Sequence, residues 1–152
     1  MLMVVADAYF KGLMRTDMEH VYPYMVKEAL LQMPEKYDSV GYIPARPDQT
    51  GEYCWDNRAL ALVAEGLGKK DDQEYFLKRS GYWRNTWDPS IRFFRARAAD
   101  GTWLDFPEDP AMNREKYTYE GSKWHWRWNV IHDVPSLISA FGGEEEFIRE
   151  LE

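Results

Sequence analysis

Two stretches at the start of the chain have apolar residues at helical spacing. In residues 2–13 the apolar positions recur every three or four residues, and the pattern ends near Gly12. Residues 18–33 repeat this spacing until Pro34, which cannot continue a helix, and Asp17 is placed to cap the first turn. Because such spacing puts the apolar side chains on one face, we predict two successive helices, the first facing a core.

The helical pattern then stops and resumes. Residues 34–50 contain prolines and Gly41 without any helical or strand period, which predicts a long irregular connection of the kind that is often functional. Thr50 is placed to cap a third helix, whose apolar positions recur until Gly66 and Gly68.

A fourth helix is predicted to begin at Asp71 or Asp72. Its aromatic face continues to Trp87, and Asp88-Pro89 ends it. The period changes from Arg92 to Phe106, where apolar and charged residues alternate around Asp100-Gly101, a pair typical of a tight turn. This segment predicts a small β-hairpin.

The end of the chain returns to helical patterns. Residues 117–132 are the richest in aromatic side chains, and Asp133 and Pro135 are typical of a helix start over 133–141. Residues 144–151 begin as an acidic helix. The whole pattern predicts one mainly α domain, with about six helices in successive antiparallel hairpins and one β-hairpin insertion.

Composition narrows the function classes. The 152 residues hold 26 Asp and Glu against 19 Lys and Arg, for a formal net charge of −7, which argues against a nucleic-acid partner. No apolar stretch reaches the roughly 20 residues of a membrane span, and the start lacks a signal-peptide pattern, so the compartment stays open. Aromatic residues make up 16% of the chain, and their flat rings suit sugar faces as well as cores.

Cys54 is the only cysteine, so an internal disulfide is excluded. As a nucleophile it would need a histidine base brought near by the fold. The alternative, which we favour, is a small buried side chain on a helix.

The segment from Tyr117 to Trp128 places one carboxylate, Glu120, beside a glycine among five aromatic residues. If these rings surround the carboxyl group, desolvation raises its pKa, as a general acid requires. The alternative is a partly exposed glutamate at a turn, with aromatic rings that only pack. His132 has two similar interpretations: a hydrogen-bonded core histidine, or a hydrogen-bond donor to a substrate.

Several segments together resemble the catalytic region of the family 92 glycoside hydrolases, which are calcium-dependent α-mannosidases that invert the anomeric centre. The similarity is collinear over nearly the whole chain. Its main carriers are Ala6-Asp7-Ala8-Tyr9-Phe10-Lys11-Gly12, Gly41-Tyr42-Ile43-Pro44, Glu52-Tyr53-Cys54-Trp55-Asp56, Asp100-Gly101-Thr102-Trp103, Tyr119-Glu120-Gly121-Ser122, and His132-Asp133-Val134-Pro135.

The resemblance implies roles for individual residues. Glu120 matches the general acid that protonates the glycosidic oxygen, and five residues are expected to contact substrate: Ser122, Trp124, His125, Trp126 and His132. The family pattern has Asn where this chain has Ser122, and Trp-Gln-Tyr where it has Trp124-His125-Trp126. Ser122 is therefore a shorter donor than the amide that it replaces, and His125 replaces an amide by a titratable ring. Both differences affect sugar contacts.

The resemblance also implies what lies elsewhere. The family's general base, its calcium ligands and much of its (α/α)6 barrel are expected outside this chain. We therefore expect this chain to form about half of a barrel, to contain no metal ligand and to be inactive alone. The expected partners are mannose-containing glycans and the missing barrel half or another copy of the chain, with a periplasmic or secreted location. The alternative is a non-catalytic helical module that binds carbohydrate or a partner.

Overall fold

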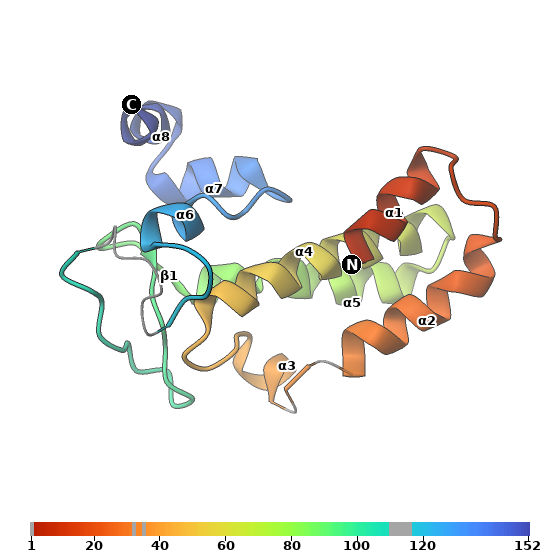
Figure 1. The fold of residues 1–152 in the computed structure, drawn as a ribbon, viewed down its shortest axis with the longest axis horizontal. Helices are drawn as coiled ribbons and strands as arrows, with labels where there is room; N and C mark the ends of the chain where they lie inside the picture. Colours follow the sequence, from red (N-terminus) through yellow and green to blue (C-terminus); the bar gives the residue numbers. More distant parts are fainter. Residues whose placement is uncertain (1, 32, 35, 110–116) are drawn as a thin grey trace.

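The computed structural model describes residues 2–31, 33–34, 36–109 and 117–152, and it is mainly α-helical (Figure 1). The helices are α1 (Leu2–Phe10), α2 (Met18–Leu31), α3 (Tyr37–Val40), α4 (Pro47–Gly66), α5 (Lys70–Ser80), the 3₁₀ turn η1 (Tyr82–Asn85), α6 (Lys123–Arg127), α7 (Val134–Phe141) and α8 (Glu144–Leu151). Two short strands, β1 (Trp87–Asp88) and β2 (Phe93–Phe94), pair antiparallel. None of the described helices is long and apolar enough to cross a bilayer.

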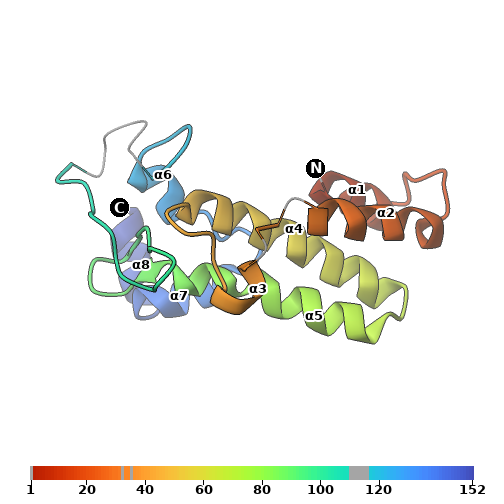
Figure 2. The ribbon, with the colours of Figure 1, turned by 90° about the horizontal axis from the view of Figure 1, so that it is seen from below.

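The long helix α4 organises the fold. It lies beside α5 in both views, with α1 and α2 around one end and α6, α7 and α8 around the other (Figures 1 and 2). Small residues in its second half, Ala59, Ala61 and Ala64, are buried and let the neighbouring helices approach closely. At its middle, the Asp56 carboxylate accepts hydrogen bonds from the first N–H groups of α1, those of Leu2 and Met3.

A second core at the other end is aromatic. The rings of Trp128 and Phe141 are stacked with centroids 5.0 Å apart, and Trp87 and Phe147 pack on Phe141 at 5.1 and 5.4 Å. This core joins β1, α7, α8 and the residues after α6. It therefore supports the segment that carries Glu120.

Two predicted helix boundaries are wrong. Thr50 does not cap α4, which begins three residues earlier at Pro47; instead, the Thr50 hydroxyl lies inside the helix, where it donates to the Arg46 carbonyl. The fourth helix ends at Ser80 rather than running to Trp87, which lies in β1. Aromatic residues keep a core-facing spacing through η1, so the pattern did not show the change of backbone.

The connection over residues 34–50 and the β-hairpin are confirmed in part. The connection contains the short helix α3 and the start of α4, so its irregular portion is shorter than predicted. Around Asp100-Gly101 a single antiparallel bridge joins Arg97 and Trp103, and Gly101 has a φ of 90°, which a glycine adopts without strain. The paired strands β1 and β2 both lie before this turn, and β1 also lies before the predicted segment.

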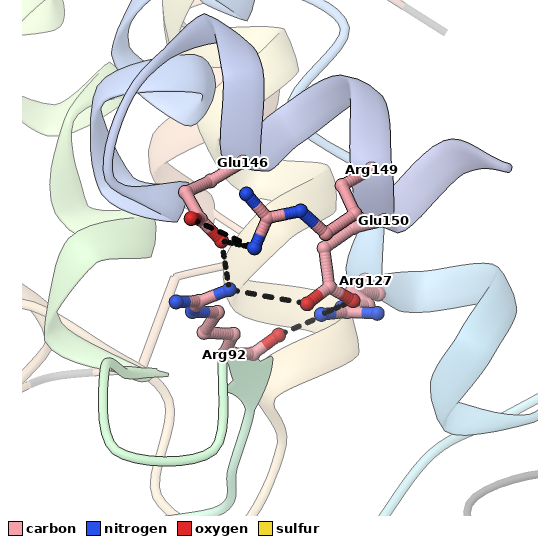
Figure 3. A network of polar contacts seen from close by, with 5 residues as sticks. All are labelled: Arg92, Arg127, Glu146, Arg149 and Glu150. Carbon is pink, nitrogen blue, oxygen red and sulfur yellow. Dashed lines mark hydrogen bonds and ion pairs between the residues drawn. The ribbon is translucent and has the colours of Figure 1, made fainter.

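The terminal helix α8 is held by a network of charged side chains (Figure 3). Arg127 is 2% exposed, donates from Nη2 to Glu150 at 2.7 Å and from Nε to the Arg92 carbonyl at 2.8 Å. Arg92 also pairs with Glu146 and Glu150 at 3.1 Å. The Arg127 guanidinium lies 4.4 Å from the Phe93 ring centre, so cation–π contacts add to its ion pair.

We expect Glu150→Gln to lower the free energy of unfolding by about 1–3 kcal/mol, because it removes a charged acceptor from a buried arginine. The hydrogen bond from Arg127 is the main cause that holds the pKa of Glu150 below its ordinary 4.5. The ionised carboxylate therefore stabilises the fold fully above pH 4.5, and this contribution is lost as the pH falls through the lowered pKa. Urea unfolding at several pH values measures both effects.

Arg149→Gln is the matched control for this prediction. Arg149 is 67% exposed and, among the described residues, pairs with Glu146, one turn away on α8, so its replacement is expected to cost about 0.5 kcal/mol or less. Equal losses for the two variants, or an unchanged acid limb in Glu150→Gln, would contradict the role given to Arg127.

Candidate functional site

Glu120 lies in the loop that leads into α6. Its φ is 52°, the left-handed region that a non-glycine residue adopts at a cost of about 1–3 kcal/mol. The residue is exposed. Of the two interpretations of Glu120, the exposed glutamate at a turn agrees with the structure of this chain.

The aromatic side chains of the segment turn to other partners. Trp124 packs edge-on against Phe93 at 4.9 Å, and Trp128 joins the aromatic core through Phe141. Trp126 donates from Nε1 to the Tyr119 carbonyl at 3.1 Å. Trp126 therefore holds the backbone of the loop around Glu120 and leaves the carboxyl group exposed.

The Tyr119 backbone is held on its other side by α4. Its N–H donates to Oδ2 of Asp48 at 3.0 Å, although the two residues are 71 positions apart. Asp48 is 2% exposed and is paired with Arg46 through two hydrogen bonds of 2.9 and 2.8 Å. Sequence reasoning missed Asp48, since nothing in the Arg46-Pro47-Asp48 spacing indicates a contact with the later segment.

Ser122 and His125 contact each other at the start of α6. The Ser122 N–H donates to Nδ1 of His125 at 3.0 Å, and the Ser122 hydroxyl lies 2.9 Å from the same atom. The bond from the Ser122 N–H is one half of a capping box; in the other half, the Ser122 side chain accepts from the His125 backbone N–H. Accepting the N–H bond requires the lone pair of Nδ1, so the other ring nitrogen carries the proton. Ser122 is buried and His125 is exposed, so the imidazole is the more accessible of the two predicted substrate contacts.

A second carboxylate lies near Glu120. The pKa of Glu52, on α4, is raised mainly by partial desolvation and next by the negative charge of Asp48. The charge of Glu120 also raises this pKa, by a smaller amount. Arg46 opposes this shift. The loop and the first turns of α4 therefore bring Glu52, Asp48 and Glu120 into one electrostatic environment.

His132 lies apart from this group. Its Nε2 is 2.9 Å from the Ser80 carbonyl, and burial is the main cause of its lowered pKa. Its ring lines an open hollow of about 370 Å³ between α1 and α4, together with apolar residues that include Phe10 and Leu62. Asp133 stands at the N-cap position of α7, as predicted. The structure thus gives His132 a half-buried position in contact with the Ser80 carbonyl and does not join it to Glu120.

Cys54 is buried in α4, and burial raises the pKa of its thiol to about 12. Its sulfur lies 3.6 Å from the Arg79 carbonyl. A thiol held in its neutral form is a poor nucleophile, so the favoured interpretation of Cys54 as a small buried side chain agrees with the structure.

The described residues do not fit a metal site. They contain no group of three or more His, Cys, Asp or Glu side chains arranged to hold an ion. Calcium takes six to eight oxygen ligands, which this arrangement does not supply.

All 152 residues match the model of the glycosyl hydrolase family 92 catalytic domain. The chain belongs to glycosyl hydrolase family 92. A secreted glycosidase of Arthroderma benhamiae is 27% identical, with 98% of this chain and 25% of that protein covered. The chain therefore spans about a quarter of the curated relative that it matches.

Two solved family 92 structures from Bacteroides thetaiotaomicron are similar over 99% of the chain. One is an inverting mannosidase, with a TM-score of 0.89, 30% identity and 22% of its own length covered. The other is an α-mannosidase, with a TM-score of 0.85, 29% identity and 21% of its length covered. The predicted fold class, antiparallel helix hairpins that form part of an (α/α)6 barrel with a small β insertion, is confirmed.

Proposed function

We propose that this chain is the acid-bearing part of an exo-acting α-mannosidase that cleaves α-1,2-linked mannose with inversion. Membership of family 92 and the similarity to an inverting mannosidase support the reaction class. The observation that carries the proposal is Glu120: it matches the family's general acid, it is exposed, and the backbone of the preceding residue, Tyr119, is held by two hydrogen bonds.

In the proposed reaction, the protonated Glu120 carboxyl group gives its proton to the glycosidic oxygen as the bond from that oxygen to the anomeric carbon breaks. A water molecule attacks the anomeric carbon from the opposite face and loses a proton to a base. The two carboxyl groups of an inverting enzyme stand roughly 6.5–9.5 Å apart, which leaves room for this water. We place the base outside this chain.

The stereochemistry of the product tests the proposal. When a full-length protein that contains this chain cleaves an α-1,2-linked mannobiose, proton NMR should detect β-mannose first, and mutarotation should then produce the α anomer. Initial α-mannose would mean retention and would exclude the inverting mechanism. Absence of any mannose release would favour a non-catalytic carbohydrate-binding or partner-binding module.

Three further proposals concern the intact protein. Its partners are mannose-containing glycans, and its calcium ligands lie outside the described residues. Its location is periplasmic or secreted, which is supported by the secreted glycosidase among its relatives. The expected packing of this chain against the missing half of the barrel, or against another copy of the chain, stays a prediction.

A further inference from the structure

The first turn of α4 carries a buried carboxylate that reaches the loop of Glu120. Asp48 is 2% exposed, and its Oδ2 accepts the Tyr119 N–H at 3.0 Å. The sequence separation of 71 residues makes this a tertiary contact and not part of a local turn. Through it, the residue directly before Glu120 is attached to the longest helix of the fold.

Arg46 fixes the orientation of this carboxylate. Its Nε and Nη2 donate to the two oxygens of Asp48 at 2.9 and 2.8 Å, and such a two-point contact prevents rotation of the carboxylate plane. The same hydrogen bonds are the main cause of the raised pKa of Arg46. The oxygen that accepts the Tyr119 N–H therefore has a defined position.

Two consecutive peptide groups are held in this way. Asp48 binds the N–H of Tyr119, and the indole of Trp126 donates to its carbonyl at 3.1 Å. The following residue, Glu120, has the left-handed φ of 52°. A non-glycine residue keeps such a backbone only where its surroundings determine it, and these two hydrogen bonds are such surroundings.

We propose that Asp48 is a positioning residue for Glu120, an inference that rests on the proposed function. A general acid must stand within hydrogen-bond reach of the leaving oxygen, and a displacement of about 1 Å can reduce the rate by roughly 10²-fold. Because Asp48 is 2% exposed, we give it no contact with the substrate. It acts by holding the backbone from which the Glu120 side chain extends.

A merely structural role for Asp48, at the start of α4, predicts something different. General destabilisation would lower activity on all substrates alike. If the acid is displaced, the rate falls most on substrates whose leaving group needs protonation. In a variant that lacks the acid, the same displacement has no further effect. The two roles are therefore separated by leaving-group dependence and by a double-mutant cycle with Glu120→Gln.

The experiment uses a full-length protein that contains this chain. Asp48→Asn keeps the size of the side chain but replaces one acceptor oxygen by a donor. It should lower kcat/KM about 10- to 100-fold on mannosides with poor leaving groups, and much less on activated aryl mannosides. In the Glu120→Gln background it should cause no further loss. Asp48→Glu keeps the charge beside Arg46 but displaces the carboxylate, so it should give the same pattern if Asp48→Asn does not fold.

Asp38→Asn is the matched control. Like Asp48, Asp38 pairs with an arginine. Asp38 lies on α3, and its partner is Arg79 on α5, which is 1% exposed. Its replacement should leave the ratio of the rates on the two substrate types unchanged. Hydrogen exchange of peptides that contain Tyr119 should be faster in Asp48→Asn than in the parent protein, and unchanged in Asp38→Asn.

Each outcome decides the proposal. Equal losses on both substrate types, a loss that persists in the Glu120→Gln background, or unchanged exchange at Tyr119 would overturn it. If exchange increases but Glu120→Gln itself shows no leaving-group dependence, the proposed function fails instead, and Asp48 is a structural residue. Faster exchange together with a loss that depends on Glu120 supports the positioning role.

Discussion

Glu120→Gln should lower kcat/KM on α-mannosides with poor leaving groups by about 10²- to 10⁴-fold, the usual contribution of general acid catalysis. Glutamine keeps the shape of the side chain but has no proton to give to the departing oxygen. Activated aryl mannosides need little protonation and should be affected much less. The measurement is kcat/KM for both substrate types in a full-length protein that contains this chain.

Glu52→Gln is the matched control for this experiment. Glu52 is the neighbouring carboxyl group with the raised pKa, and the change is chemically the same. It should leave the ratio between the two substrate types unaltered. A leaving-group-dependent loss in Glu52→Gln, with small and equal losses in Glu120→Gln, would assign the acid to Glu52.

The sequence shows which residues are near Glu120 along the chain, but not whether its carboxyl group is buried. Counting five aromatic residues near a carboxylate says nothing about where their rings point. In the structure, Phe93 and Phe141, which belong to other segments, receive the rings of Trp124 and Trp128. Both partners are tertiary neighbours, so the pattern within the segment could not show that the carboxyl group is left exposed.

Helix periodicity predicted the order of the helices because their apolar faces form the core. The boundaries were less predictable where tertiary contacts decide them. Thr50 has the residue type of a cap, but Pro47 starts the helix earlier, which places Asp48 in its first turn. That shift is what lets Asp48 meet Tyr119. The preference of threonine for cap positions led to a wrong helix start at Thr50. For the same reason, the contact of Asp48 that positions the candidate acid was not predicted.

Phe141→Ala should lower the free energy of unfolding of the 152-residue chain by about 3–5 kcal/mol, the usual cost of truncating a buried phenylalanine. Phe141 is 1% exposed and stacks on Trp128. It also contacts Trp87 and Phe147, so the cavity would open between β1, α7 and α8. A domain's total stability is roughly 5–15 kcal/mol, so this one change removes a large part of it.

Urea unfolding measures this loss, and Phe10→Ala is the control with the same chemical change. Phe10 is 56% exposed on α1, so its truncation leaves little cavity and should cost about 0.5 kcal/mol. Because Arg127 lies 4.8 Å from the Phe141 ring centre, Phe141→Ala should also speed hydrogen exchange in α8, which Arg127 holds through Glu150. Equal destabilisation by the two variants would show that the aromatic core does not support the C-terminal helices as described.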